Sequence, residues 1–172
     1  MRNTGIYIKR LLVTPAEIEC FASSLDLEKA EDPPHVTLIY SKRAVDWRNS
    51  VFLERQDFLT ISPVGAQLDR FGEHLVVKLK SSKLRERFDC LVRAGAVSDH
   101  AEFQPHITIG RDPQEQVCLQ TPVDLRKPLI FGSEMRKVPK ECRTASQHVP
   151  DLRSSNTRGH RNKPSSGAIT HE

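Results

Sequence analysis

The chain has 172 residues, of which 37% are hydrophobic and 28% are charged, so it can hold one ordinary domain and a polar extension. Lysine and arginine total 26 against 22 aspartates and glutamates, a net charge of +4, which favours a small phosphorylated ligand and is too small for binding along duplex DNA. No apolar run approaches the roughly 20 residues that span a bilayer. The four cysteines stand singly and no leader segment is evident, so we expect a cytoplasmic protein that does not bind membranes.

The composition changes near residue 140. From Glu141 to Glu172 there is no Phe, Tyr or Trp and no apolar periodicity, and Ser, Thr, Asn, Arg and Pro predominate. A segment of this kind cannot bury enough apolar surface to offset the entropy of ordering. We therefore predict one folded domain over residues 1–140 and a disordered polar tail over residues 141–172.

The first third of the chain predicts a strand, a helix and a second strand. Residues 5–13 are apolar and rich in β-branched side chains, as in strands. Thr14 and Pro15 then give an N-cap and a first-turn proline, which predict that a helix begins there. Two prolines, Pro33 and Pro34, exclude any helical continuation and lead into an extended segment over residues 35–41.

The remainder predicts two strands, a second helix and two further strands. We expect strands over residues 58–68 and 74–80, joined by a turn at residues 69–72, and a helix capped by Ser81 or Ser82. The apolar residues of that helix fall on one face. Pro105 and Pro128 precede the last two strands, over residues 106–111 and 129–135, so the expected order is βαβ(ββ)αββ.

One short pattern occurs twice, at an offset of 71 residues. Pro34-His35-Val36-Thr37-Leu38 corresponds to Pro105-His106-Ile107-Thr108-Ile109, and a predicted helix precedes each copy. This spacing is too long for a solenoid repeat. We predict an α+β fold of two pseudo-symmetric lobes of antiparallel β-sheet, with helices packed outside and the two histidine strands meeting at a central cleft.

The repeated His-x-Thr pattern suits phosphodiester cleavage. Side chains alternate along a strand, so His35 and Thr37 point to one face, as do His106 and Thr108, whereas Tyr40 falls on the core face. Imidazole, with an ordinary pKa near 6.5, serves as base or acid near neutrality, and the scheme begins with one neutral and one charged histidine. The hydroxyls would bind the phosphate. Neither histidine has neighbours spaced as metal ligands, so we expect no metal and no cofactor.

These motifs resemble the two-histidine (2H) phosphoesterase superfamily, whose signature is a pair of His-x-Thr or His-x-Ser motifs. Within it, the segment His-Val-Thr-Leu-Ile-Tyr-Ser, the early Tyr7 and Pro-His-Ile-Thr-Ile look most like phage anti-CBASS phosphodiesterases, which destroy cyclic-nucleotide alarm signals. The resemblance implies that the two His-x-Thr pairs are catalytic. It also implies that Tyr7 and Glu134 contact a cyclic oligonucleotide substrate. The aromatic residue that follows the glutamate in that family has no counterpart here, where Lys137, Val138 and Lys140 stand.

Three functions remain open on the sequence. The first is hydrolysis of cyclic di- or trinucleotide signals such as 3′,3′-cGAMP, which rests on the resemblance. The second, opening of 2′,3′-cyclic phosphates at RNA ends, would use the same four residues. The third is a non-catalytic module that binds nucleotides or RNA in the same cleft, although binding alone does not require paired imidazoles.

Overall fold

The computed structural model describes residues 4–98, 100 and 102–139, so the predicted tail lies outside the described residues. Neither helix in this part of the chain is long and apolar enough to cross a membrane. The elements in chain order are β1 (Thr4–Leu12), α1 (Ala16–Ser24), β2 (His35–Val45), the 3-10 helix η1 (Ser50–Phe52), β3 (Leu59–Ile61), β4 (Gln67–Phe71), β5 (His74–Lys78), α2 (Ser82–Arg93), β6 (His106–Arg111) and β7 (Leu129–Lys137).

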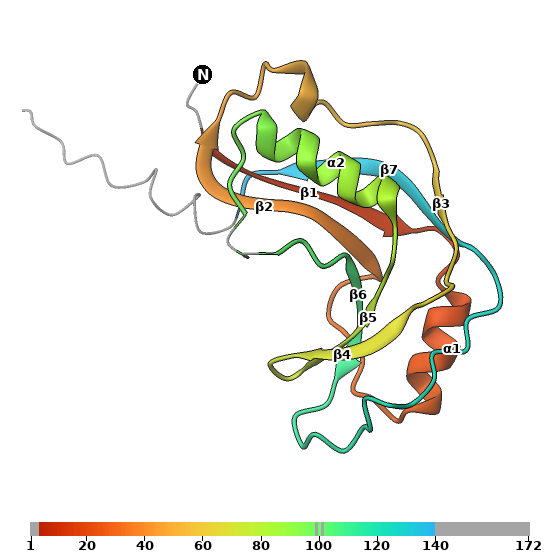
Figure 1. The fold of residues 1–172 in the computed structure, drawn as a ribbon. Coiled ribbons are helices and arrows are strands. Elements are labelled where there is room, and N and C mark those ends of the chain that lie inside the picture. The colour runs from red at the N-terminus through yellow and green to blue at the C-terminus, as the bar shows by residue number, and fades with distance from the viewer. Residues whose placement is uncertain (1–3, 99, 101, 140–172) are drawn as a thin grey trace, which may run out of the picture.

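The strands form one antiparallel sheet with the order β3-β7-β1-β2-β6-β5-β4. It contains two similar units, β1-α1-β2 and β5-α2-β6, each with a helix between two adjacent antiparallel strands. The units meet where β2 pairs with β6, through the single residue pair Val36 and Ile107. In Figure 1 the half with β1, β2 and β7 lies above the half with β4, β5 and β6. The predicted α+β class with two antiparallel lobes is confirmed.

Both units carry a β-bulge at the same place in the motif. Between β1 and β2 the register passes from Ile8–Ile39 to Lys9–Thr37, which leaves Leu38 as the extra residue. Between β5 and β6 it passes from Leu75–Gly110 to Val76–Thr108, which leaves Ile109. Each extra residue is the third after its histidine, and a bulge shifts the alternation of all residues beyond it. The internal repeat therefore extends from sequence to backbone geometry.

The helices pack against the sheet face opposite the histidines. Ile18 of α1 and Leu84 and Leu91 of α2 belong to one buried apolar cluster with Val36 and Ile107. Because side chains alternate, the His and Thr of each motif point away from that core. The core thus fixes the two strands from one side and leaves the other face to the functional groups.

The two helix starts differ from each other. The Ser81 hydroxyl accepts a hydrogen bond from the Leu84 amide (3.3 Å), which confirms the predicted cap of α2. At α1 the N-cap is Pro15, without a side-chain bond, so the prediction that Thr14 caps this helix was wrong. The Thr14 hydroxyl instead accepts from the Ile130 amide (3.4 Å), which ties the helix start to β7.

The segment predicted as one strand over residues 58–68 forms two strands at opposite edges of the sheet. β3 pairs with β7, whereas β4 pairs with β5. Pro63 and Gly65, the latter with φ of 77°, lie between them, so the chain leaves one edge and crosses to the other. The predicted hairpin also turns later than expected: β4 continues to Phe71, and Gly72, with φ of 60°, makes the turn.

Candidate active site

The two His-x-Thr motifs lie side by side about the Val36–Ile107 pair. The strands run antiparallel there, so His35 lies on the side of Thr108 and Thr37 on the side of His106. All four of these side chains are half-buried on one face of the sheet. The arrangement has approximate two-fold symmetry, with one imidazole and one hydroxyl at each end, and suits a group bound between the histidines.

Each imidazole is held by the carbonyl two residues before it. His35 Nδ1 donates to the Pro33 oxygen (2.8 Å), and His106 Nδ1 donates to the Gln104 oxygen (2.7 Å). A carbonyl only accepts, so each Nδ1 carries its hydrogen in the neutral and the charged state alike. Proton exchange with a ligand is consequently left to Nε2 on both rings.

Burial lowers the pKa of both histidines. For His35 the bond to the Pro33 carbonyl partly offsets this effect, and the nearby Lys9 charge lowers the pKa further. For His106 the bond to Gln104 and the charge of Asp69 act against burial, whereas His100 adds to it. Both rings therefore favour the neutral form in the free protein at neutral pH. The charged histidine of the sequence-based scheme would gain its proton when an anion binds, since an adjacent negative charge raises an imidazole pKa.

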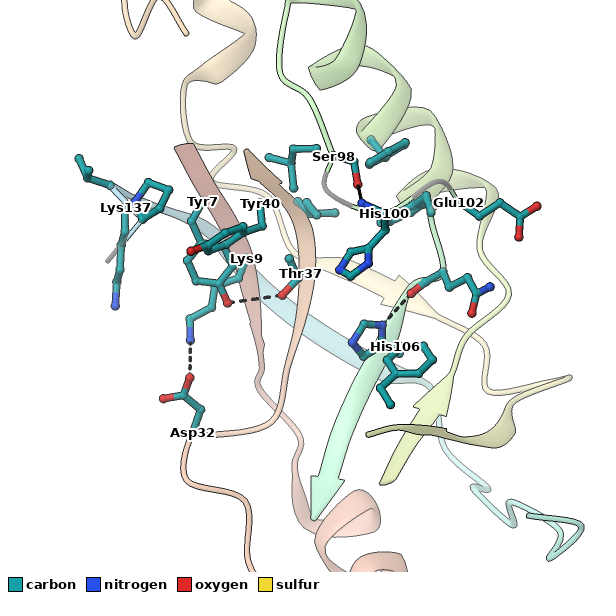
Figure 2. Close-up of a pocket in the computed structure, with 18 residues that line it drawn as sticks. Tyr7, Lys9, Asp32, Thr37, Tyr40, Ser98, His100, Glu102, His106 and Lys137 are labelled. Carbon is teal, nitrogen blue, oxygen red and sulfur yellow. Dashed lines mark hydrogen bonds and ion pairs between the residues drawn. The ribbon is translucent and has the colours of Figure 1, made fainter. Parts of the chain in front are cut away.

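The Tyr7 hydroxyl contacts both the histidine and the threonine of the first motif. It lies 3.1 Å from His35 Nε2 and 3.4 Å from the Thr37 hydroxyl, and Figure 2 shows it pointing toward Thr37. Burial raises the pKa of Tyr7, so the phenol stays protonated and can donate to the neutral imidazole. Tyr7 thus lies beside two of the four motif residues, where the resemblance places a ligand contact.

A cleft of about 990 Å³ opens along these strands, at the large end of the range usual for small-ligand sites. Figure 2 shows its lining, drawn from β1, β2, β6 and the segments around them. Aromatic side chains make up much of the wall: Tyr7, Tyr40, Phe71, Phe88 and Phe103. Planar rings in a half-open cleft suit the flat faces of nucleobases.

Tyr40 corrects a prediction made from strict alternation. The extra residue Leu38 reverses the side-chain alternation beyond Thr37, so Tyr40 points into the cleft and not into the core. Its ring packs edge to face on Tyr7, with centroids 5.6 Å apart and planes at 62°. The sequence contains no turn residue that signals this bulge.

Three further cleft residues lie outside the site predicted from the sequence. Lys9 lines the wall beside Tyr7, and His100 lines it near His106. Phe71, the last residue of β4, packs edge to face on the His106 ring with centroids 4.7 Å apart. None of the three stands in a repeated motif, so sequence spacing gave no reason to group them with the histidines.

Glu134 lies away from the cleft, which departs from the expectation that it contacts the ligand. Its side chain has no exposed surface. Arg87 of α2 donates to both carboxylate oxygens (2.9 and 2.7 Å), and Arg10 of β1 donates from 3.3 Å. The network joins β7, β1 and α2 on the helix-covered side of the sheet. The geometry therefore gives Glu134 a structural position, and a ligand could reach it only after rearrangement.

The histidines have no companions that would form a metal site in the described part of the chain. Among residues 4–98, 100 and 102–139, no three His, Cys, Asp or Glu side chains gather closely enough to hold an ion. Of the predicted site residues, Tyr7, Thr37 and His106 line the cleft, whereas His35 and Thr108 do not. His35 adjoins the lining through the contact of its Nε2 with the Tyr7 hydroxyl (3.1 Å).

A family model for anti-CBASS protein Acb1 matches residues 4–141, which span both motifs, the cleft and every strand of the sheet. The chain belongs to the Acb1 family. Among curated Acb1 proteins, one from Caulobacter sp. (strain RHG1) is 33% identical over 80% of this chain, and one from Sphingomonas paeninsulae is 32% identical over 76%. The Acb1 of Escherichia phage RB16 is 28% identical over 72% of this chain and 76% of its own length.

The two bacterial relatives are much longer than this chain. This chain spans only 23% and 22% of the two bacterial proteins, respectively. Among solved structures, a phosphoesterase (TM-score 0.47) and LigT of E. coli complexed with 3′-AMP (TM-score 0.46) are each similar over 78% of this chain and 87% of theirs, at 16% identity. The resemblance to the anti-CBASS phosphodiesterases, drawn from the two motifs, is confirmed at the level of the family.

Proposed function

We propose that this Acb1-family chain is a metal-independent phosphodiesterase that hydrolyses cyclic di- or trinucleotide signals, such as 3′,3′-cGAMP, in the cytoplasm of a bacterial host and so counters CBASS defence. The observation that carries the proposal is the pairing of the two His-x-Thr motifs about Val36 and Ile107, with both Nε2 atoms left for proton transfer. Membership of the anti-CBASS Acb1 family supports a cyclic-oligonucleotide substrate.

The proposed reaction uses His35 and His106 as an acid–base pair. The neutral Nε2 of one ring takes a proton from the attacking oxygen as that oxygen forms a bond to phosphorus. The bond from phosphorus to the leaving oxygen breaks, and the protonated Nε2 of the other ring gives that oxygen its proton. Water as the nucleophile yields a linear oligonucleotide that ends in a phosphate monoester. Between turnovers the base releases its proton to solvent and the acid takes one up, which restores the starting protonation states.

Thr37 and Thr108 would donate hydrogen bonds to the nonbridging oxygens of the scissile phosphate. Charge increases on these oxygens as the nucleophile adds, so donors placed there stabilise the transition state more than the ground state. Tyr7 would position His35 Nε2 before the substrate binds and then donate to the phosphate or to an adjoining ribose. Approximate two-fold symmetry would allow either phosphodiester of a cyclic dinucleotide to lie between the histidines.

The test is an incubation of the full chain in EDTA with three substrates: 3′,3′-cGAMP, cyclic tri-adenylate and an RNA that ends in a 2′,3′-cyclic phosphate. Chromatography identifies the products, and His35→Ala and His106→Ala serve as controls. Consumption of a cyclic oligonucleotide, lost in both variants, is the expected result. Processing of the RNA end alone would assign the second function that the sequence left open. Loss of activity in EDTA and its return with a divalent ion would overturn the metal-independent scheme.

A further inference from the structure

Lys9 is a buried cation in the wall of the cleft. Only 8% of its side-chain surface is exposed, and the residue lines the cleft together with Tyr7 and Thr37. Its ammonium lies 3.7 Å from a carboxylate oxygen of Asp32, whose own side chain is 71% exposed; Figure 2 shows this pair at the edge of the cleft. Burial of an ammonium group is unfavourable unless anions or hydrogen-bond acceptors surround it.

The sheet register places Lys9 beside a proposed phosphate donor. Lys9 is the direct partner of Thr37 across β1 and β2, so both side chains leave the sheet on the cleft face. Directly opposed residues of antiparallel strands have Cβ atoms about 4.5–5.5 Å apart. The Lys9 Nζ also lies 5.8 Å from the centre of the Tyr7 ring, whose hydroxyl contacts His35. A group bound at Thr37 is therefore within reach of the Lys9 ammonium.

The ion pair with Asp32 leaves capacity for a second anion. Charge-assisted hydrogen bonds from ammonium to carboxylate are about 2.7–2.9 Å long, so the separation of 3.7 Å is a loose pair. An ammonium group has three N–H donors. Asp32 is exposed to solvent, so Lys9 can turn partly away from it at little cost.

The second unit has no cation at the register position that corresponds to Lys9. The residue that the matching bulge brings opposite Thr108 is Val76, which is apolar and 1% exposed. Thr37 thus has a lysine as its direct cross-strand partner, whereas Thr108 has an apolar residue. At the histidines the register is reversed, since Lys78 lies opposite His106 and Leu11 lies opposite His35.

We propose that Lys9 is the phosphate-binding cation of this site, which neutralises a nonbridging oxygen of the scissile phosphate beside Thr37 and makes the Thr37 position distinct from the Thr108 position. This inference rests on the proposed function, because it assigns Lys9 a role toward the phosphate that the histidines would cleave. A positive charge there stabilises the added negative charge of the transition state.

The same charge has a second effect that can be measured. Tyr7, Lys9, Asp32 and His106 are the titratable groups that surround His35, from β1, from the segment before β2 and from β6. Of these, Lys9 and His106 lower the pKa of His35, whereas Asp32 raises it. Removal of the ammonium therefore raises the pKa of His35, and His106, at the other end, responds less.

The experiment compares Lys9→Met, which keeps the unbranched stem, with Lys9→Arg, which keeps the charge. Lys83→Met is the matched control, because Lys83 is exposed on α2 and does not line the cleft. NMR follows the His35 and His106 resonances against pH and against added inorganic phosphate, and circular dichroism checks folding. Lys9→Gln replaces Lys9→Met if the methionine variant does not fold.

The expected result is that Lys9→Met weakens phosphate binding about 10-fold, raises the pKa of His35 and lowers kcat/KM about 100-fold, comparable to loss of one charge-stabilising donor. Lys9→Arg should recover most of the phosphate affinity, and Lys83→Met should match the unmodified chain. Unchanged phosphate affinity and unchanged His35 titration in Lys9→Met would overturn the inference. The unmodified chain could cleave no cyclic oligonucleotide and yet bind inorganic phosphate in a way that depends on Lys9. The proposed substrate would then be wrong, and the assignment of Lys9 would stand.

Discussion

At the scale of single residues, the site depends on where each imidazole is held. Both Nδ1 atoms donate to a backbone carbonyl two positions earlier, so the backbone that precedes each strand sets the ring orientation. The sequence predicted the residues of this set from the repeated motif and the chemistry of imidazole. It did not predict the carbonyl contacts, since nothing in Pro33 or Gln104 as residue types specifies which way their carbonyls point.

The lowered histidine pKa values predict an acidic pH optimum. Burial favours the neutral rings, so both histidine pKa values lie below the ordinary imidazole value of 6.5 in the free enzyme. The base is therefore deprotonated, and the acid loses its proton, at a lower pH than an exposed histidine would. We expect a bell-shaped profile of kcat/KM with its maximum below pH 6.5. The profile of kcat should lie at higher pH, because the bound phosphate raises both pKa values. Initial rates across pH 4.5–9 at ~0.15 M salt check this, and a kcat/KM maximum above pH 8 would contradict it.

Removal of the Tyr7 hydroxyl should affect rate more than stability. Tyr7→Phe loses the contacts with His35 Nε2 and the Thr37 hydroxyl but keeps the ring that packs on Tyr40. One such hydrogen bond contributes about 1 kcal/mol, so we expect a decrease of roughly 5- to 10-fold in kcat. Steady-state kinetics and a thermal melt on the same sample give the comparison. A melting shift of many degrees with unchanged kcat would assign Tyr7 to the fold instead.

At the scale of elements, the two bulges decide which side chains reach the cleft. Strand alternation correctly placed the His and Thr residues, which precede the extra residues Leu38 and Ile109, and failed for Tyr40, which follows one. The apolar content of residues 58–68 predicts one strand, whereas the structure has β3 and β4 there, because Pro63 and Gly65 interrupt the segment. Local pattern predicts that strands exist, and long-range pairing sets their register.

The ion-pair network at Glu134 should matter for stability. Its fully buried carboxylate accepts from Arg87 and Arg10, so Glu134→Gln leaves the buried Arg87 without its anion and Arg10 with only the Asp57 carboxylate. Removal of one partner from a buried pair costs about 3–5 kcal/mol. The control Asp57→Asn removes a carboxylate that also contacts Arg10 but is 59% exposed, and should cost at most about 1 kcal/mol. Urea unfolding measures both, and an unchanged midpoint for Glu134→Gln together with lost activity would restore the ligand role that the family resemblance implied.

At the scale of the whole molecule, two similar units lie side by side in one sheet and are joined where β2 pairs with β6. The order of elements, the two lobes and the shared cleft could be predicted because the motif recurs at a fixed offset with a helix before each copy. The departures from symmetry could not, since Lys9 and Val76 occupy matching positions only through the bulged registers. These departures give Thr37 and Thr108 different cross-strand neighbours.

The division of the chain at residue 140 gives a test at this scale. The described strands and the family match end at residues 137 and 141, respectively, and the composition beyond them lacks apolar periodicity. A chain of residues 1–140 should keep the melting temperature and kcat/KM of the full chain within about 2-fold, because such segments add little burial. Differential scanning fluorimetry and steady-state rates check this. A loss of 10-fold or more in kcat/KM would assign residues 141–172 to the active site.

The central claim is that His35 and His106 act together on one phosphorus, and a mutant cycle tests it most directly. Single-turnover rates on 3′,3′-cGAMP would be measured for His35→Ala, His106→Ala and the double variant, with His74→Ala on β5 as a control that belongs to neither His-x-Thr motif. Each single change should reduce the rate about 10³-fold, and the double change should cost little more than either one, since an acid without its base does not catalyse. A variant that loses one of the two histidines and still cleaves at the full rate would contradict the account.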